Sequence, residues 1–163
     1  MTGKATELAD MTQRRKVDIF CVQETRWKGN KARSLGAEFK LFYNDVDKKR
    51  NGVEIIVKEE LIRNVVEVKR VSGRLIMLKA TCLLISLKLA RGYAPQIGCE
   101  LEEKEKFWSE LDEVMQNIHK GERVVIGTDF NGPVRVVNRG DEEVMGRIGI
   151  QNRNAEGQVV VDF

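Results

Sequence analysis

The sequence is poor in the features that mark disordered, secreted or membrane-spanning chains. It contains only two Pro beside 14 Gly, and 42% of its residues are hydrophobic, which is the composition of a chain with a packed core. No apolar run approaches the roughly 20 residues of a membrane-spanning helix, and we expect no secretory leader. These absences favour an intracellular protein, nuclear or cytoplasmic, without a membrane partner. We expect one domain covering residues 1–163.

Cysteine and histidine are also scarce. The three cysteines, Cys21, Cys82 and Cys99, are odd in number and scattered. Since Cys21 and Cys82 lie inside apolar runs, we expect reduced core thiols and neither a disulfide framework nor a zinc cluster. The one histidine, His119, stands at the end of a predicted helix, where a cation suits the helix dipole. That position argues against a catalytic role for His119.

Charge is distributed unevenly along the chain. Residues 1–50 carry 12 Lys or Arg against 7 Asp or Glu, whereas residues 100–120 carry 3 against 7. A basic N-terminal part is compatible with a phosphate-bearing partner such as DNA. A solvated surface of mixed charge explains the same balance, because the net charge of the chain is only +3. The sequence makes no prediction of an oligomeric state.

Hydrophobic periodicity predicts a chain that mixes strands and helices. The helix expected at residues 101–120 has the clearest pattern, with Phe107, Leu111 and Val114 on one apolar stripe. The strand expected at residues 17–22 is almost continuously apolar, which predicts burial on both faces. The remaining expected elements are a helix at 4–15, strands at 38–43, 53–57 and 124–126, two strands within 75–89 joined by a turn near 80–83, and a last segment at 154–163 that Asn154 caps.

The loop after the strand at 124–126 carries the most informative polar residues. Gly127 ends the apolar run, and Asp129 and Asn131 follow it. In layered folds, the loop after a core strand is where polar chemistry is displayed. If the chain stays extended there, both side chains point the same way. Asp129 can then hold a metal or take a proton from water, and Asn131 can bind a phosphate oxygen. The alternative is a turn in which both residues merely cap backbone groups.

Two further strand ends carry candidate residues. Glu24 follows the strand at 17–22, and if that strand lies beside the one at 124–126, Glu24 and Asp129 converge on one rim. Carboxylate and amide oxygens suit Mg²⁺ or Mn²⁺ better than zinc. The alternative is a surface ion pair of Glu24 with a nearby Arg or Lys. Tyr93 follows the strand before the main helix, where its phenol either binds a phosphate or anchors the loop.

The three loops together resemble those of a known superfamily. They read Gln23-Glu24-Thr25, Gly92-Tyr93-Ala94-Pro95 and Gly127-Thr128-Asp129-Phe130-Asn131, each after an apolar strand. In order and spacing they are similar to the endonuclease/exonuclease/phosphatase superfamily, the group of exonuclease III and the apurinic endonucleases. The segment Arg14-Arg15-Lys16-Val17-Asp18-Ile19 and the residues 102–108 resemble, more closely, the endonuclease domains of RTE-type LINE retrotransposons.

The resemblance implies a fold, a reaction and a set of roles. The fold would be a two-sheet α/β sandwich, and the reaction would be metal-dependent hydrolysis of a phosphodiester in DNA. Glu24 would be the metal ligand, and Asp129 would position or deprotonate the attacking water or support the metal. Asn131 would hold the phosphate and Tyr93 would contact it. These roles agree with the chemistry, because the transition state needs a cation and hydrogen-bond donors near its oxygens.

The chain also departs from the superfamily pattern. The superfamily begins with a strand carrying an Asn near the metal and ends with an Asp-His pair, and His119 does not match that pair in position. We therefore expect an incomplete sandwich, truncated at both ends, that binds Mg²⁺ (or Mn²⁺) weakly if at all and is catalytically weakened. The alternative is a non-catalytic domesticated module that binds DNA or another protein.

Overall fold

The fold is described from a computed structural model. It covers residues 7, 11–12, 14–23, 31–36, 38–44, 52–82, 85–96, 98–132 and 154–163. The described residues between 7 and 15 are helical, as the sequence predicts.

The first sheet is antiparallel throughout. Its strands are β1 (Ile19–Gln23), β2 (Ala32–Leu35), β3 (Phe39–Asn44) and β4 (Val53–Lys58), in the spatial order β1-β4-β3-β2. Within the part of the chain that the structure describes, β1 is therefore an edge strand, and its residues from Ile19 to Val22 are only half-buried. The expectation of burial on both faces is wrong, because an apolar run alone does not reveal where in a sheet a strand lies.

The second sheet is mixed. It contains β5 (Val65–Ser72), β6 (Leu75–Cys82), β7 (Ile85–Gly92) and β8 (Arg123–Ile126), in the order β5-β6-β7-β8. The hairpin of β6 and β7 confirms the two strands expected within 75–89, with the connection slightly later than predicted. The pair β7·β8 is parallel. Parallel neighbours need a crossover, and here helix α3 (Leu101–Gln116) provides it.

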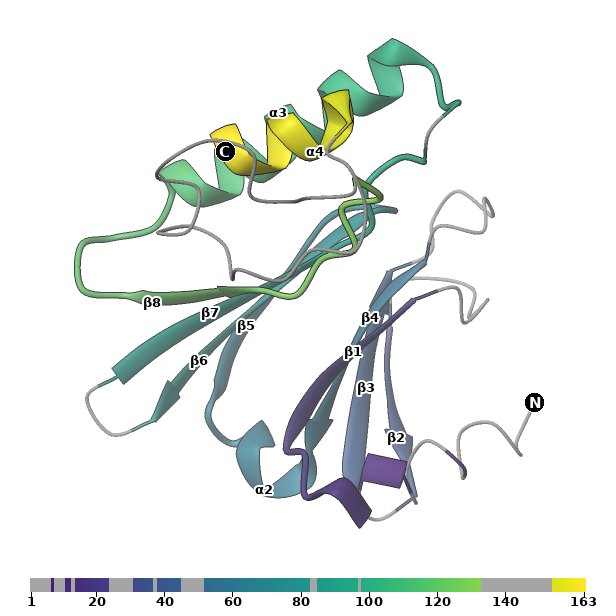
Figure 1. Ribbon diagram of the computed structural model, residues 1–163. Coiled ribbons are helices and arrows are strands. Elements are labelled where there is room, and N and C mark those ends of the chain that lie inside the picture. The colour runs from purple at the N-terminus through teal and green to yellow at the C-terminus, as the bar shows by residue number, and fades with distance from the viewer. Residues whose placement is uncertain are drawn as a thin grey trace.

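The two sheets pack face to face, and helices cover one outer face. In Figure 1, α3 and α4 (Ala155–Asp162) run along the outer side of the second sheet, while the first sheet lies on its other side. A short helix that the sequence did not reveal, α2 (Glu59–Ile62), follows β4 directly. The two-sheet α/β sandwich is thus confirmed. Among the described residues, no helix is both long and apolar enough to cross a membrane.

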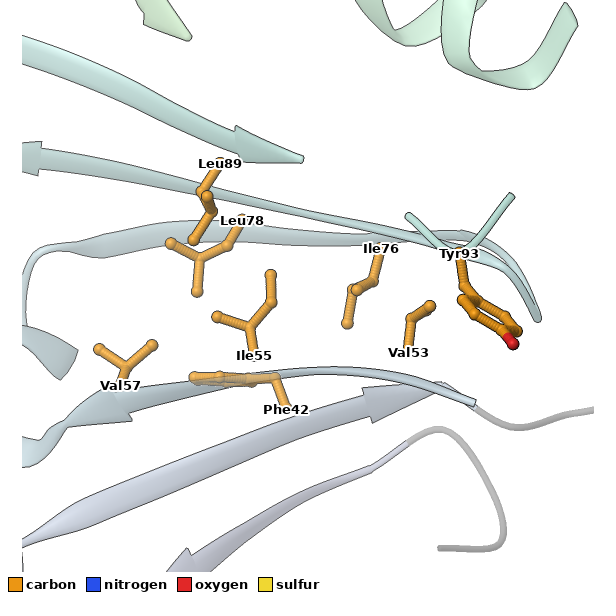
Figure 2. Packing of buried hydrophobic residues seen from close by; sticks show 8 residues of the cluster. All are labelled: Phe42, Val53, Ile55, Val57, Ile76, Leu78, Leu89 and Tyr93. Carbon is orange, nitrogen blue, oxygen red and sulfur yellow. The ribbon is translucent and has the colours of Figure 1, made fainter. Parts of the chain in front are cut away.

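Strand alternation divides the core into layers. On β6, Ile76 and Leu78 face the first sheet, whereas Leu75 and Met77 face α3. Figure 2 shows the layer between the sheets, where side chains of β3 and β4 meet those of β6 and β7, with Tyr93 at one end. Burial of one such aliphatic side chain contributes about 1.5–3 kcal/mol. On the helix side, Phe107, Leu111 and Val114 of α3 are buried, which confirms the predicted stripe.

Candidate active site

The parallel pair β7·β8 brings two of the predicted loops together. Ala90 aligns with Ile126 at the end of the ladder, and the Gly127 N–H donates to the Ala90 carbonyl at 2.9 Å. Beyond the strands, Tyr93 and Asp129 form a parallel bridge, and the Ala94 N–H donates to the Asp129 carbonyl at 3.0 Å. The loops that carry Tyr93 and Asp129 therefore lie side by side at one rim of the sandwich.

The chain does not stay extended between Asp129 and Asn131. Asn131 has a positive φ of 51°, in the left-handed region that Asn tolerates. Asp129 Oδ1 accepts the Asn131 N–H at 2.9 Å, and Asn131 Nδ2 donates to the Ala94 carbonyl at 2.7 Å. Of the two alternatives that the sequence left open, the structure contains the turn, because the short polar side chains bond to backbone groups nearby. Asp129 is exposed and Asn131 half-buried at the rim.

Most of the Tyr93 side chain is buried in the core. It is 5% exposed and packs with Val53 and Ile76 between the sheets (Figure 2). Its hydroxyl accepts a hydrogen bond from Gln96 Nε2 at 2.9 Å. The Arg74 guanidinium lies 5.9 Å from the ring centroid, and Arg74 Nη1 donates to the Tyr93 carbonyl at 3.3 Å. These contacts hold the start of the Tyr93 loop in place.

A buried cation that the sequence did not single out stands beneath the same rim. Arg91 is 5% exposed, and its Nη1 donates to the carbonyls of Gly92 and Gly127, each at 2.6 Å. Burial lowers the pKa of Arg91, while the charges of Cys21 and Asp129 oppose that change. The strand period could have revealed it, because Arg91 lies two residues from both Leu89 and Tyr93 and therefore shares their face, which points between the sheets.

The first sheet reaches this rim from across the sandwich. The sequence left open whether the strands before Glu24 and Asp129 lie side by side. They do not, since β1 and β8 belong to different sheets, and their ends approach each other across the sandwich. A Cβ placed on Gly127 would lie 3.1 Å from Cys21 Sγ of β1. Burial raises the pKa of the Cys21 thiol, partly opposed by Arg91. The facing strands border a shallow hollow lined by Cys21, Val22, Arg91, Ile126, Gly127, Thr128 and Asp129.

Glu24 lies outside the described residues, directly after β1. Within the part of the chain that is described, no three His, Cys, Asp or Glu side chains cluster as metal ligands would. The structure therefore brings Tyr93, Asp129 and Asn131 together, and it leaves the placement of Glu24 as a prediction.

Aromatic side chains support the Asp129 loop from the helix side. The Trp108 ring of α3 stacks on Phe130, with centroids 5.6 Å apart and planes 1° from parallel. Phe163, which caps the end of α4, approaches the same Trp108 ring at 5.5 Å. Phe130 stands between Asp129 and Asn131, so this stack joins the loop to both helices.

A second group of charged side chains lies where β8 begins, at the far end of the sheet from Asp129. Glu122 accepts Lys79 and Lys88 at 2.8 and 2.7 Å, and Lys88 Nζ also donates to the Asn117 carbonyl at 2.7 Å. Lys88 therefore supplies the cation at the end of α3 that the sequence assigned to His119. His119 instead donates its backbone N–H to Glu122 Oε2 at 3.0 Å. This group stabilises the helix end and is not part of the candidate site.

Comparison with known proteins shows which fold the chain has. No family model matches the chain. Craniofacial development protein 2 of Tragulus javanicus and of Bos taurus are each 23% identical over 164 residues, which cover 99% of this chain and 28% and 27% of those proteins. The endonuclease domain of TRAS1, a telomere-specific non-LTR retrotransposon, superposes with a TM-score of 0.63 at 15% identity, covering 97% of this chain and 62% of that domain.

The chain has the endonuclease/exonuclease/phosphatase fold. TDP2 from C. elegans shares this fold with a TM-score of 0.57 at 19% identity, over 80% of this chain and 43% of that structure. An endonuclease/exonuclease/phosphatase family protein from Leptotrichia buccalis has a TM-score of 0.50 at 10% identity, over 80% and 61%. The chain spans little more than a quarter of the length of the curated relatives that it matches. The superfamily likeness recognised in the sequence is thus confirmed at the level of the fold.

Proposed function

We propose that this chain is a DNA phosphodiesterase domain that uses a divalent metal, and that its chemistry takes place at the rim where Tyr93 and Asp129 meet. The observation that carries the proposal is the exposed residue Asp129, whose backbone is held by a β-bridge to Tyr93 beside the hollow between the two sheets. The solved structure of TRAS1 with this fold is an endonuclease domain, which supports the same class of reaction here.

The residues at the rim fit a hard cation. Asp129 Oδ1 accepts the Asn131 N–H, but a carboxylate has about four acceptor positions, so this bond does not exhaust it. Oxygen ligands of this kind suit Mg²⁺ or Mn²⁺, and Glu24 would complete the set. When bound, the metal would supply a Lewis acid for the phosphoryl oxygens. Asp129 would orient or deprotonate the attacking water, while Asn131 and Tyr93 would donate to the phosphate.

The reaction should be slow in residues 1–163. One N–H of the Asn131 carboxamide is used on the Ala94 carbonyl, and the Tyr93 side chain is only 5% exposed, so neither donor is fully available to a substrate. Catalysis by hydrogen-bond donors depends on their being oriented in advance, and the absence of one such donor typically costs about 10²–10³ in rate. We expect weak Mg²⁺ binding and slow nicking of DNA.

The test is nicking of supercoiled plasmid with Mg²⁺, with EDTA, and with the variant Asp129→Asn. Asn at position 129 keeps an oxygen for the Asn131 N–H and removes only the charge. We expect EDTA to abolish nicking and Asp129→Asn to lower it about 10²-fold or more, as for loss of an acid or base group. Asp112→Asn, on the exposed face of α3, is the matched control and should nick like the wild type. Nicking that survives both EDTA and Asp129→Asn would refute the proposal.

The second candidate is a module that binds DNA or a protein without catalysis. It is favoured by the same hydrogen bonds, since the side chains of Asp129, Asn131 and Tyr93 all stabilise their own loops. A module of this kind would show no Mg²⁺-dependent nicking. Binding to DNA by the basic N-terminal part would instead weaken steeply as salt is raised, because phosphate contacts release counterions. Salt-dependent binding without nicking therefore distinguishes the two candidates.

A further inference from the structure

The two buried cations of β7, Lys88 and Arg91, bind different partners. Lys88 in the middle of the strand is 6% exposed and contacts Glu122 and the end of α3. Arg91 near the C-terminal end of the strand is 5% exposed and bonds to two backbone carbonyls, those of Gly92 and Gly127. Lys88 therefore stabilises a helix end through an ion pair, whereas the bonds of Arg91 to Gly92 and Gly127 join the end of β7 to the exit of β8.

Gly127 is fixed from both sides by these contacts. Its N–H donates to the Ala90 carbonyl at 2.9 Å, and its carbonyl accepts Arg91 Nη1 at 2.6 Å. Thr128 adds a third connection, because its Oγ1 accepts the Gly92 N–H at 3.1 Å. The chain then reaches Asp129 only two residues after Gly127. The guanidinium thus acts at the point where regular strand pairing ends and the Asp129 loop begins.

A guanidinium is costly to bury, and a buried charge breaks the continuity of an apolar layer. The layer between the sheets is otherwise made of side chains such as Leu89 and Ile76 in the same region. An apolar residue at position 91 would pack there without the desolvation cost, but it could not hold the Gly127 carbonyl. The hydrogen bonds of Arg91 therefore fix the geometry of the rim and do not serve mainly to stabilise the core.

We propose that Arg91 is a positioning residue for the candidate site: its guanidinium fixes the exit of β8 over Cys21 and so sets where the Asp129 loop stands at the rim. The role in a reaction rests on the proposed phosphodiesterase function. The positioning of the Asp129 loop by Arg91 does not depend on that function, and hydrogen exchange tests it separately.

Hydrogen exchange of backbone amides measures the positioning directly in the full chain. In Arg91→Met we expect the Gly127 and Ala94 amides, which bond to Ala90 and Asp129, to exchange at least about tenfold faster, since charge-assisted hydrogen bonds that restrain this loop are lost. The Lys58 amide, which bonds to the Asp18 carbonyl in the first sheet, should keep its wild-type rate.

The matched control is Lys88→Met, which removes an equally buried cation from the same strand. It should accelerate exchange at the other end of the sheet, at the Glu122 amide that bonds to His119, and leave Gly127 and Ala94 at wild-type rates. Both variants are measured at a temperature at which circular dichroism shows them folded.

Nicking kinetics then test the link to the reaction. We expect Arg91→Met to lower kcat about tenfold or more while KM stays near the wild-type value, because a displaced Asp129 affects the transition state more than DNA binding. Lys88→Met should change neither. Wild-type exchange at Gly127 and Ala94 in Arg91→Met overturns the inference, and so does faster exchange with an unchanged kcat. If the wild type does not nick, the proposed function fails instead, and exchange alone decides whether Arg91 positions the loop.

Discussion

Gly92 shows at the scale of a single residue how closely the rim is packed. A Cβ at this position would lie 2.9 Å from Thr128 Oγ1, 3.1 Å from Thr128 Cγ2 and 3.3 Å from the Phe107 ring. The Gly92 N–H donates to the same Thr128 Oγ1. The absence of a side chain thus lets the β7 end approach the Asp129 loop closely enough for this bond.

Gly92→Ala should therefore destabilise the fold by about 1–3 kcal/mol, the usual cost of overpacking a tight site. The added methyl has to displace Thr128, and with it the neighbouring Asp129. Urea unfolding followed by circular dichroism measures the loss. Thr128→Ala removes both close atoms, so the double variant should lose less stability than the two single losses added together. Strict additivity would show that the two residues do not collide.

The turn at Asp129 is also decided by single side chains. Asp and Asn are common in turns because their short side chains hydrogen-bond nearby backbone groups. Here the Asp129 side chain accepts the Asn131 N–H, and the Asn131 side chain donates to the Ala94 carbonyl. The sequence offered both an extended pair and a self-capped turn, and the turn is what the structure contains. Catalytic and turn-forming roles are compatible for Asp129, because a carboxylate accepts more than one bond.

Helix α4 is the element that a local sequence signal defines best. Asn154 precedes it in an extended conformation, and its Oδ1 accepts the Gly157 N–H at 2.8 Å. This confirms the cap expected at Asn154. The helix then places Phe163 against Trp108, which stacks on Phe130 of the Asp129 loop. A cap distant from the rim is thus connected to it through packed rings.

Asn154→Ala should lower the free energy of unfolding by about 1 kcal/mol, the typical cost of losing an N-cap side chain. Asn154→Asp is the matched control, since it keeps an acceptor and adds a negative charge that suits a helix N-terminus. We expect the Asp variant to be at least as stable as the wild type in urea unfolding. Equal stability of the Ala variant and the wild type would mean that α4 contributes little to the fold.

The free energy of unfolding should depend on pH through the titration of Glu122. Hydrogen bonds from Lys79, from Lys88 and from the His119 N–H hold the pKa of Glu122 well below its usual range. The folded pKa thus lies below the unfolded value of about 4.3. The resulting stability is present above that unfolded value and is lost as pH falls through it toward the folded pKa.

We expect the wild type to lose stability below about pH 5, and Glu122→Gln to lose less over the same range, because Gln does not titrate. Above pH 5 the Gln variant should be the less stable of the two, since Lys79 and Lys88 lose their anionic partner. Urea unfolding between pH 3 and pH 7 measures both effects. Parallel pH profiles of the two proteins would contradict the assignment.

Local patterns were sufficient for much of this fold. The apolar stripe of α3, the hairpin of β6 and β7, the strand β8 and the cap at Asn154 each depend on residues close together in sequence. Placement of Tyr93 and Asp129 after strands was also predictable, because an apolar run followed by Gly is a local signal. These features gave the superfamily likeness that the comparison with solved structures supports at the level of the fold.

What the sequence determined by itself was most of the longer elements, though not β2, α2 or β5, and the strand ends that carry polar residues. Only the tertiary structure decided that β1 and β8 face each other across two sheets, that Arg91 bonds to Gly127, and that Lys88 meets the end of α3. The physical reason is sheet pairing: the partner of a strand residue is chosen by long-range hydrogen bonds and by burial of one face, and neither is encoded within a short window of sequence.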